Sequence, residues 1–232
     1  MGSLLLAGGA EFGGRMAEPD RLALARAGGP TVRVRIVPAA AAPDHNDQRA
    51  GRNAVRWFRG LGARDVDVVP LTNRAGAENA TVASELERAQ LIYLLGGFTH
   101  YLGQTLAGSR SERALRNAHA AGAVLAGSSA GAMVLCAHYY DPTEGELRTG
   151  LGFVPGACFI PHHDTFGRSW PDKLGPRLPG VWLIGVDEAT GMLDDGTGQN
   201  WEVAGGGRVT LYRGGAVQSF AAGERLTLAA GG

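Results

Sequence analysis

The sequence has no excess of charge of either sign, little cysteine and no long hydrophobic run. Lysine and arginine total 22, as do aspartate and glutamate, so no net field favours nucleic acid or an anionic membrane as a partner. No apolar run approaches the length of a membrane span. Two cysteines, Cys136 and Cys158, are too few for a disulfide framework or a zinc site. The segment Gly2–Ala7 lacks the basic region and the length of a signal peptide, so we expect a cytoplasmic protein.

What the sequence does contain is alternating strand-like and helix-like segments. With 232 residues, 44% of them hydrophobic, the chain can bury a substantial core, and we expect residues 1–232 to form a single domain. Strands are predicted at residues 4–6, 31–37, 66–71, 91–95 and 124–125, and helices at 16–27, 44–61, 82–89, 99–107 and 111–121. This alternation predicts an α/β fold whose sheet is largely parallel and carries helices on both faces.

The pattern changes after about Pro179. Short strand-like segments, separated by Gly-rich turns, are predicted at residues 182–186, 191–193, 201–203, 208–212 and 216–220. We interpret them as hairpins that close an edge of the same domain.

The segment Gly127–Gly131 is the strongest indication of chemistry. A small apolar strand ends in Gly127-Ser128-Ser129-Ala130-Gly131 and leads into a helix-compatible run, as in a sharp strand-to-helix turn with a serine at its tip. Only Ser129 has glycine both two residues before and two residues after it, so Ser129 is the candidate nucleophile. The alternative is a Gly/Ser/Ala turn that merely packs a helix closely against a sheet.

A serine hydroxyl needs a general base and donors for the developing oxyanion. His162 and His163 follow the apolar run Cys158–Pro161, which places them at a strand end. Because side chains alternate along a strand, the two rings should point in opposite directions, and one of them should meet Ser129. Adjacent histidines can also bind metal, but no third ligand has suitable spacing. The Ala130 N–H and the Gly96-Gly97 turn are the candidate oxyanion donors.

Four motifs taken together resemble a known family. They are Gly96-Gly97-Phe98-Thr99, the serine segment Gly127–Ala132, Gly150–Phe153 leading to Pro161-His162, and Gly185–Thr190. In this order and spacing the chain is similar to the S51 serine peptidases, which comprise the aspartyl dipeptidases (peptidase E) and the cyanophycinases. The resemblance extends over about residues 4–220. It implies a class I glutamine amidotransferase-like, flavodoxin-like three-layer α/β fold with C-terminal β-hairpins.

The resemblance also implies roles for individual residues. Ser129 would be the nucleophile and His162 the base, with Gly97 and Ala130 as oxyanion donors. The third catalytic member would be Glu188, in the Asp-Glu motif, or Asp141, which follows the nucleophile helix. Asp141 precedes Pro142 and also suits a turn.

Substrate recognition is expected to involve a cation, because peptidase E-like members cleave after an N-terminal aspartate. Arg168, six residues after His162, is the first candidate for binding that carboxylate and Arg148 the second. Phe98, which replaces the asparagine usual in that turn of the family, and His163 complete the expected substrate-binding set.

The resulting hypothesis is a serine dipeptidase or exopeptidase that acts on short peptides with N-terminal aspartate. The alternatives are a cyanophycinase-like hydrolase of β-Asp-Arg material and a non-catalytic ligand-binding protein on the same fold. A cysteine-based amidotransferase is disfavoured, because the turn carries serine. The expected partner is a small peptide substrate, with a homodimer left open; no cofactor, metal, nucleic acid or membrane partner is expected.

Overall fold

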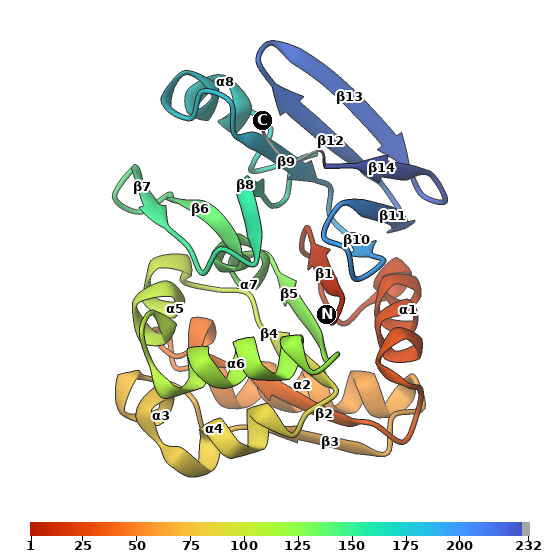
Figure 1. Ribbon diagram of the computed structural model, residues 1–232, viewed down its shortest axis with the longest axis vertical. Helices are drawn as coiled ribbons and strands as arrows, with labels where there is room; N and C mark the ends of the chain where they lie inside the picture. The colour runs from red at the N-terminus through yellow and green to blue at the C-terminus, as the bar shows by residue number, and fades with distance from the viewer. Residues whose placement is uncertain (229–232) are drawn as a thin grey trace.

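A large mixed sheet forms the centre of the protein in a computed structural model, which describes residues 1–228 (Figure 1). Its strand order is β14-β11-β10-β1-β5-β4-β2-β3. The parallel half consists of β1 (Leu4–Ala7), β5 (Val124–Ser128), β4 (Leu91–Leu94), β2 (Arg33–Val37) and β3 (Asp65–Val68). The antiparallel half adds β10 (Thr190–Asp194), β11 (Asn200–Gly205) and β14 (Arg225–Thr227).

Helices cover both faces of this sheet, as the alternation of its apolar side chains requires. Leu4 and Leu6 of β1 pack into one hydrophobic cluster and Leu5 into another. The Leu5 cluster includes residues of α1 (Ala17–Ala27) and α2 (Asp47–Gly60). The opposite cluster includes residues of α3 (Arg74–Glu78), α4 (Ala80–Glu87), α5 (Thr99–Leu106) and α6 (Arg110–Ala120). The predicted α/β class with helices on both faces is therefore confirmed.

A second sheet, in the upper half of Figure 1, has the order β13-β12-β9-β8-β6-β7. Its strands are β6 (Cys136–Asp141), β7 (Glu146–Thr149), β8 (Val154–Ile160), β9 (Trp182–Val186), β12 (Arg208–Arg213) and β13 (Ala216–Ala221). The expected C-terminal hairpins exist as β10–β11 and β12–β13, but they belong to different sheets. The sequence pattern did not indicate β6 and β7, because neither segment alternates regularly between apolar and polar residues.

The topology brings four segments to one edge of the main sheet. In β1, β5 and β4, which are parallel neighbours, Ala7 pairs with Ser128 and Leu94 with Gly127, so their carboxyl ends coincide. Because β10 runs antiparallel to β1, the residues that precede β10 lie at the same edge. Ligand sites of open α/β sheets lie at such carboxyl ends.

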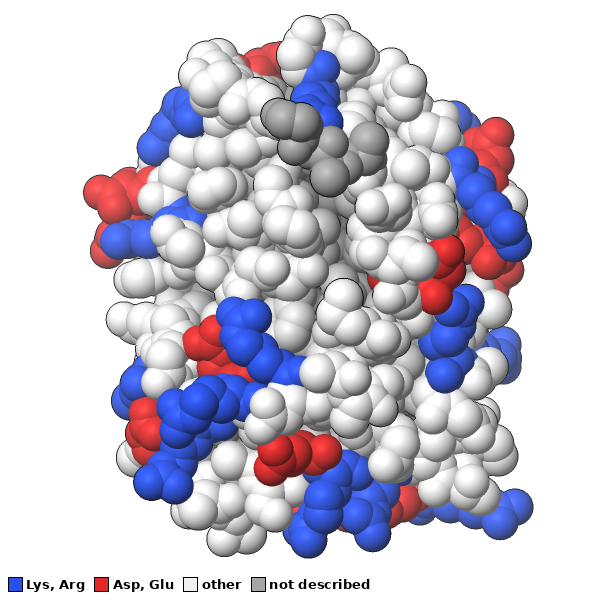
Figure 2. Space-filling model, in the orientation of Figure 1, with Lys and Arg blue, Asp and Glu red and all other residues white. Residues whose placement is uncertain are grey.

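The short helices η1 (Gly14–Met16) and η2 (Ala39–Ala41) follow β1 and β2, while α8 (Trp170–Leu174) and η3 (Gly175–Arg177) precede β9. Among residues 1–228, no helix combines the length and apolar character that a membrane crossing requires. Figure 2 shows that acidic and basic side chains are interspersed on the face in view, in keeping with the equal charge totals.

Candidate active site

A strained turn places Ser129 between β5 and α7 (Ala130–Leu135). Its φ of 49° and ψ of −111° are unusual for a residue with a side chain, and such strain concentrates at functional sites. Glycine is needed on both sides for packing: a Cβ on Gly127 would lie 2.4 Å from the Gly131 carbonyl carbon, and one on Gly131 would lie 2.1 Å from the Leu94 oxygen. The predicted strand–turn–helix context of Ser129 is therefore present. The helix itself is short, because it ends at Leu135 and Cys136 already belongs to β6.

His162 lies between Ser129 and Glu188. Its Nε2 is 3.1 Å from Ser129 Oγ, and its Nδ1 is 2.9 Å from Glu188 Oε1. The His162 side chain is 26% exposed and the Glu188 side chain 41%, so a ligand can reach both. A carboxylate on Nδ1 favours the tautomer whose Nε2 can accept a proton from the serine. The arrangement thus has the connectivity of a Ser-His-acid triad.

Contacts with the loop that follows β1 hold the histidine and the acid in place. His162 has a φ of 48° and donates its backbone N–H to Gly8 O at 2.9 Å. A Cβ on Gly9 would lie 2.2 Å from the His162 ring, so glycine is required there. Ala189, which follows Glu188 and has a φ of 52°, donates to Gly9 O at 3.1 Å.

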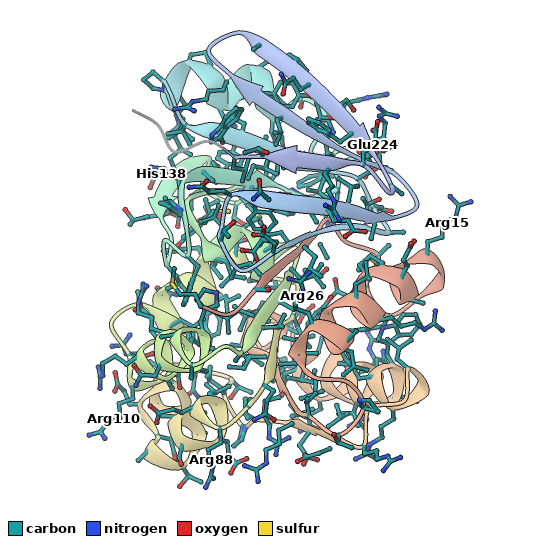
Figure 3. All side chains as sticks on the ribbon, turned by 45° about the vertical axis from the view of Figure 1, so that its right-hand side comes forward. Arg15, Arg26, Arg88, Arg110, His138 and Glu224 are labelled. Carbon is teal, nitrogen blue, oxygen red and sulfur yellow. The ribbon has the colours of Figure 1, made fainter. Side chains whose placement is uncertain are left out.

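The adjacent His163 points the other way, as expected, although β8 ends at Ile160 and His162 has a φ of 48°, so the two residues lie on a turn rather than on a strand. Its Nε2 is 2.8 Å from the Tyr212 hydroxyl and its Nδ1 is 3.4 Å from Asp187 Oδ1. The ring also packs on Gly185, where a Cβ would lie 2.4 Å from it. These contacts direct the ring toward the second sheet rather than toward Ser129. They do not support the expectation that His163 binds substrate. Of the other histidines, His138 lies on β6 at the margin of the view in Figure 3.

Asp141 is not brought to His162. It is buried at the end of β6, where its Oδ1 accepts the Thr143 N–H at 3.0 Å. This is the turn-forming role that the following proline suggests. Of the two acids that the sequence left open, the structure places Glu188 on the histidine.

The candidate oxyanion donors lie on neighbouring strand ends. Gly97 has a φ of 137°, and a Cβ there would lie 2.3 Å from Ala40 O, so the turn depends on glycine. Phe98 donates to Ala40 O at 2.8 Å and is 45% exposed. Ala130 is the first residue of α7, where an N–H has no partner within the helix. In the part of the chain that the structure describes, neither the Gly97 N–H nor the Ala130 N–H has a hydrogen-bond partner in another segment.

Candidate substrate-binding arginines occur in two places. Arg168 is exposed on the turn after His162, whereas Arg148 is paired with Glu144 and Glu146 on the outer hairpin. A second group lies in an open cavity of ≈ 820 Å³ between α1 and α2. Its charged and amide lining residues are Glu11, Arg21, Asn46, Arg49, Asn53 and Arg56. These arginines are far from the motifs in sequence, and no local pattern indicated them.

Glu11 is a further residue that the motifs did not reveal. Ser128 Oγ donates to its Oε2 at 2.5 Å, and the Gly96 N–H donates to its Oε1 at 3.3 Å. The carboxylate therefore contacts both the residue before Ser129 and the turn that carries Gly97. The sequence feature that could have indicated Glu11 is its position shortly after the Gly8-Gly9 pair.

Neither cysteine is suited to act as a nucleophile. Both are buried, and burial raises the pKa of the Cys158 thiol to about 12 and that of Cys136 well above its usual range. A thiol must ionise to react, so these groups are inert structural residues.

A serine on a strained elbow, bonded to an imidazole that contacts a carboxylate, is the arrangement of a serine hydrolase. The sequence profile of peptidase family S51 matches residues 4–174. A cyanophycinase of Trichormus variabilis is 28% identical over 229 residues, which cover 90% of this chain and 72% of that protein. A cyanophycinase of Synechococcus elongatus is 30% identical over 205 residues, covering 80% of this chain and 60% of the relative.

Solved structures agree with this assignment. A peptidase from an acI-B1 Actinobacterium is 28% identical with a TM-score of 0.85, and the match covers 98% of this chain and 97% of that one. A putative peptidase E protein from Listeria monocytogenes shares the fold at 16% identity, with a TM-score of 0.61 and coverage of 95% and 98%. The chain belongs to peptidase family S51. It is a hydrolase of the serine peptidase type.

Proposed function

We propose that the protein is a dipeptidase or exopeptidase that hydrolyses short peptides after an N-terminal aspartate. The observation that carries the mechanism is the continuous hydrogen-bonded series from Ser129 through His162 to Glu188, with separations of 3.1 and 2.9 Å. The preference for an acidic substrate is supported by the arginines of the neighbouring cavity and by Arg168.

The reaction would proceed through an acyl-enzyme. Ser129 Oγ attacks the scissile carbonyl while His162 Nε2 accepts its proton, and Glu188 stabilises the resulting imidazolium. The N–H groups of Gly97 and Ala130 bind the oxyanion, and His162 then protonates the leaving amine. Water, activated by the same imidazole, hydrolyses the ester and restores the serine.

A cyanophycinase-like activity on β-Asp-Arg material is the rival, since the curated relatives above bear that name. An arginine side chain of the substrate requires acidic partners. The cavity between α1 and α2, which shares Glu11 with the site, offers three arginines and one glutamate, a lining that favours a carboxylate over a guanidinium. We therefore favour the aspartyl substrate.

A panel of dipeptides tests the proposal directly. We expect kcat/KM for Asp-Leu to exceed that for the uncharged isostere Asn-Leu and for β-Asp-Arg by at least about tenfold, a difference typical of one charged contact. Ser129→Ala should lower kcat by about 10³-fold or more. Full activity of that variant would exclude the mechanism, and a preference for β-Asp-Arg would exclude the specificity.

Arginine variants test which residues produce the expected preference for a substrate with an N-terminal aspartate. The triple variant Arg21→Ala/Arg49→Ala/Arg56→Ala and the single variant Arg168→Ala each remove one candidate group, and Arg52→Ala is the control, because it lies on α2 outside the cavity lining. The ratio of kcat/KM for Asp-Leu to that for Asn-Leu should collapse in one of the first two variants and remain in the control. An unchanged ratio in all three would show that neither group binds the carboxylate.

A further inference from the structure

The loop that follows β1, residues 8–13, contacts every part of the candidate site. Its backbone holds the histidine and the acid, through Gly8 O with the His162 N–H and through Gly9 O with the Ala189 N–H. Its one acidic side chain, Glu11, reaches the two remaining parts, the serine elbow and the Gly96-Gly97 turn. A single short segment thus links elements that are far apart in the sequence.

Glu11 is held in a constrained position. The residues on either side of it, Ala10 and Phe12, have φ values of 54° and 63°, a region that residues with a side chain seldom adopt. The Phe12 ring packs against Phe58 and Tyr93, with centroid separations of 6.5 and 5.6 Å. Strained backbone of this kind persists where the surrounding packing determines it, and it concentrates at functional sites.

The two contacts of the Glu11 carboxylate restrain a turn that would otherwise be flexible. Gly96 and Gly97 are consecutive glycines, whose backbone is intrinsically free to rotate. An oxyanion donor is effective only when its N–H direction is fixed before the reaction. The direction of the Gly97 N–H depends on the dihedral angles of Gly96, and the Glu11 carboxylate accepts the Gly96 N–H. Hydrogen bonds to a charged carboxylate are stronger than those to a neutral acceptor.

We propose that Glu11 is a positioning residue of the oxyanion site, which fixes the Gly96-Gly97 turn relative to the Ser129 elbow. It acts through Gly96 and Ser128 and forms no bond to the reacting atoms. This inference rests on the proposed function, because it requires Ser129 to be the nucleophile and the Gly97 N–H to be an oxyanion donor.

The test compares Glu11→Ala and Glu11→Gln with the wild-type chain on the preferred dipeptide. In Glu11→Ala we expect kcat to fall about 10- to 100-fold, less than for loss of a donor itself, while KM changes less than about threefold. Glu11→Gln retains one acceptor oxygen and should lose less. The Ki of a peptide boronate, which forms a tetrahedral anionic adduct on serine, should rise by the same factor as kcat falls. The Ki of the amino-acid product should stay nearly constant.

These readouts separate positioning from a general effect on folding. A merely structural role would weaken boronate and product binding together and lower the melting temperature in parallel with kcat. Should Glu11→Ala fail to fold, Glu11→Gln and Ser128→Ala, which removes one of the two contacts, supply the same comparison. If kcat and boronate affinity in the folded variants stay within about twofold of wild type, the inference is wrong.

Failure of the proposed function is recognised independently. A fluorophosphonate should label the wild-type chain at Ser129 and should not label Ser129→Ala. An unlabelled, inactive wild type would overturn the proposed function and the role of Glu11 with it. A labelled, active wild type whose Glu11 variants behave normally would overturn only the role of Glu11.

Discussion

Backbone strain at the scale of single residues coincides with the candidate triad. Ser129 and His162 both have φ near 50°, as does Ala189 directly after Glu188. Each such residue with a side chain is disfavoured by about 1–3 kcal/mol, so the surrounding contacts must hold it there. In these conformations the serine hydroxyl and the imidazole face one another at 3.1 Å.

The two adjacent histidines should differ sharply in their effect on the reaction. His162→Ala is expected to lower kcat by about 10³-fold or more, since it removes the group in contact with Ser129 Oγ. His163→Ala should lower kcat less than about tenfold, because its ring contacts Tyr212 and Asp187 instead. Steady-state kinetics on Asp-Leu measure both, and the opposite order would assign the base to His163.

The two candidate acids can be separated in the same way. Glu188→Gln should lower kcat by about 10²- to 10⁴-fold, because the amide no longer stabilises the imidazolium. Asp141→Asn, which retains an oxygen for the Thr143 N–H, should change kcat less than about threefold. The rate of covalent labelling by a fluorophosphonate provides a second measurement. Equal effects of the two substitutions on kcat and on this rate would argue against Glu188.

At the scale of elements, the position of α7 depends on glycines that let it approach the sheet. Gly131 lies inside the helix and packs against the Leu94 carbonyl of β4. A Cβ at this position would lie 2.1 Å from the Leu94 oxygen, so no residue with a side chain fits there. The helix is therefore seated over the strand ends, with its first N–H at the serine.

Gly131→Ala is expected to destabilise the protein by about 1–3 kcal/mol, the usual cost of overpacking, and to reduce activity by displacing α7. Gly60→Ala is the control, since a Cβ at that position, the last residue of α2, meets no atom within 4 Å. Urea denaturation of the two variants measures the difference. Equal stabilities would show that α7 can shift without cost.

At the scale of the whole molecule, a buried carboxyl group makes stability depend on pH. Asp20 of α1 is fully buried against α2, where Trp57 donates its indole N–H to Oδ2 at 2.8 Å. Burial raises the pKa of Asp20 from 3.8 to about 7. Between these values the folded state retains a proton that the unfolded state has lost, so the free energy of unfolding falls as pH rises.

The Asp20→Asn variant should lack this dependence, because an amide mimics the protonated acid. From about pH 4 to about pH 8 the wild type should lose about 4 kcal/mol more stability than the variant, on an order-of-magnitude conversion of the pKa change. Urea denaturation of both proteins at the two pH values measures the difference. Parallel pH profiles would show that Asp20 ionises normally in the folded state.

The sequence by itself determined the α/β class and the strand-to-helix turn at Ser129. These features depend on local patterns: the alternation of strand-like and helix-like segments, and two glycines around a serine. The opposite orientations of His162 and His163 were also expected, but the two residues lie on a turn after β8, so alternation along a strand is not their cause. The family followed from four motifs in order, and the comparisons confirm it. The single domain, the substrate and the assembly remain predictions.

Only the tertiary structure decided which acid meets the histidine, and that Glu11 contacts the serine elbow and the Gly96-Gly97 turn. Glu188 is 26 residues from His162 in sequence, and Glu11 is 117 residues from Ser128. Contacts of this kind depend on the order of strands in the sheet, which places β1, β5 and the start of β10 at one edge. Local preferences carry no information about that order, because it arises from burial of apolar faces over the whole chain.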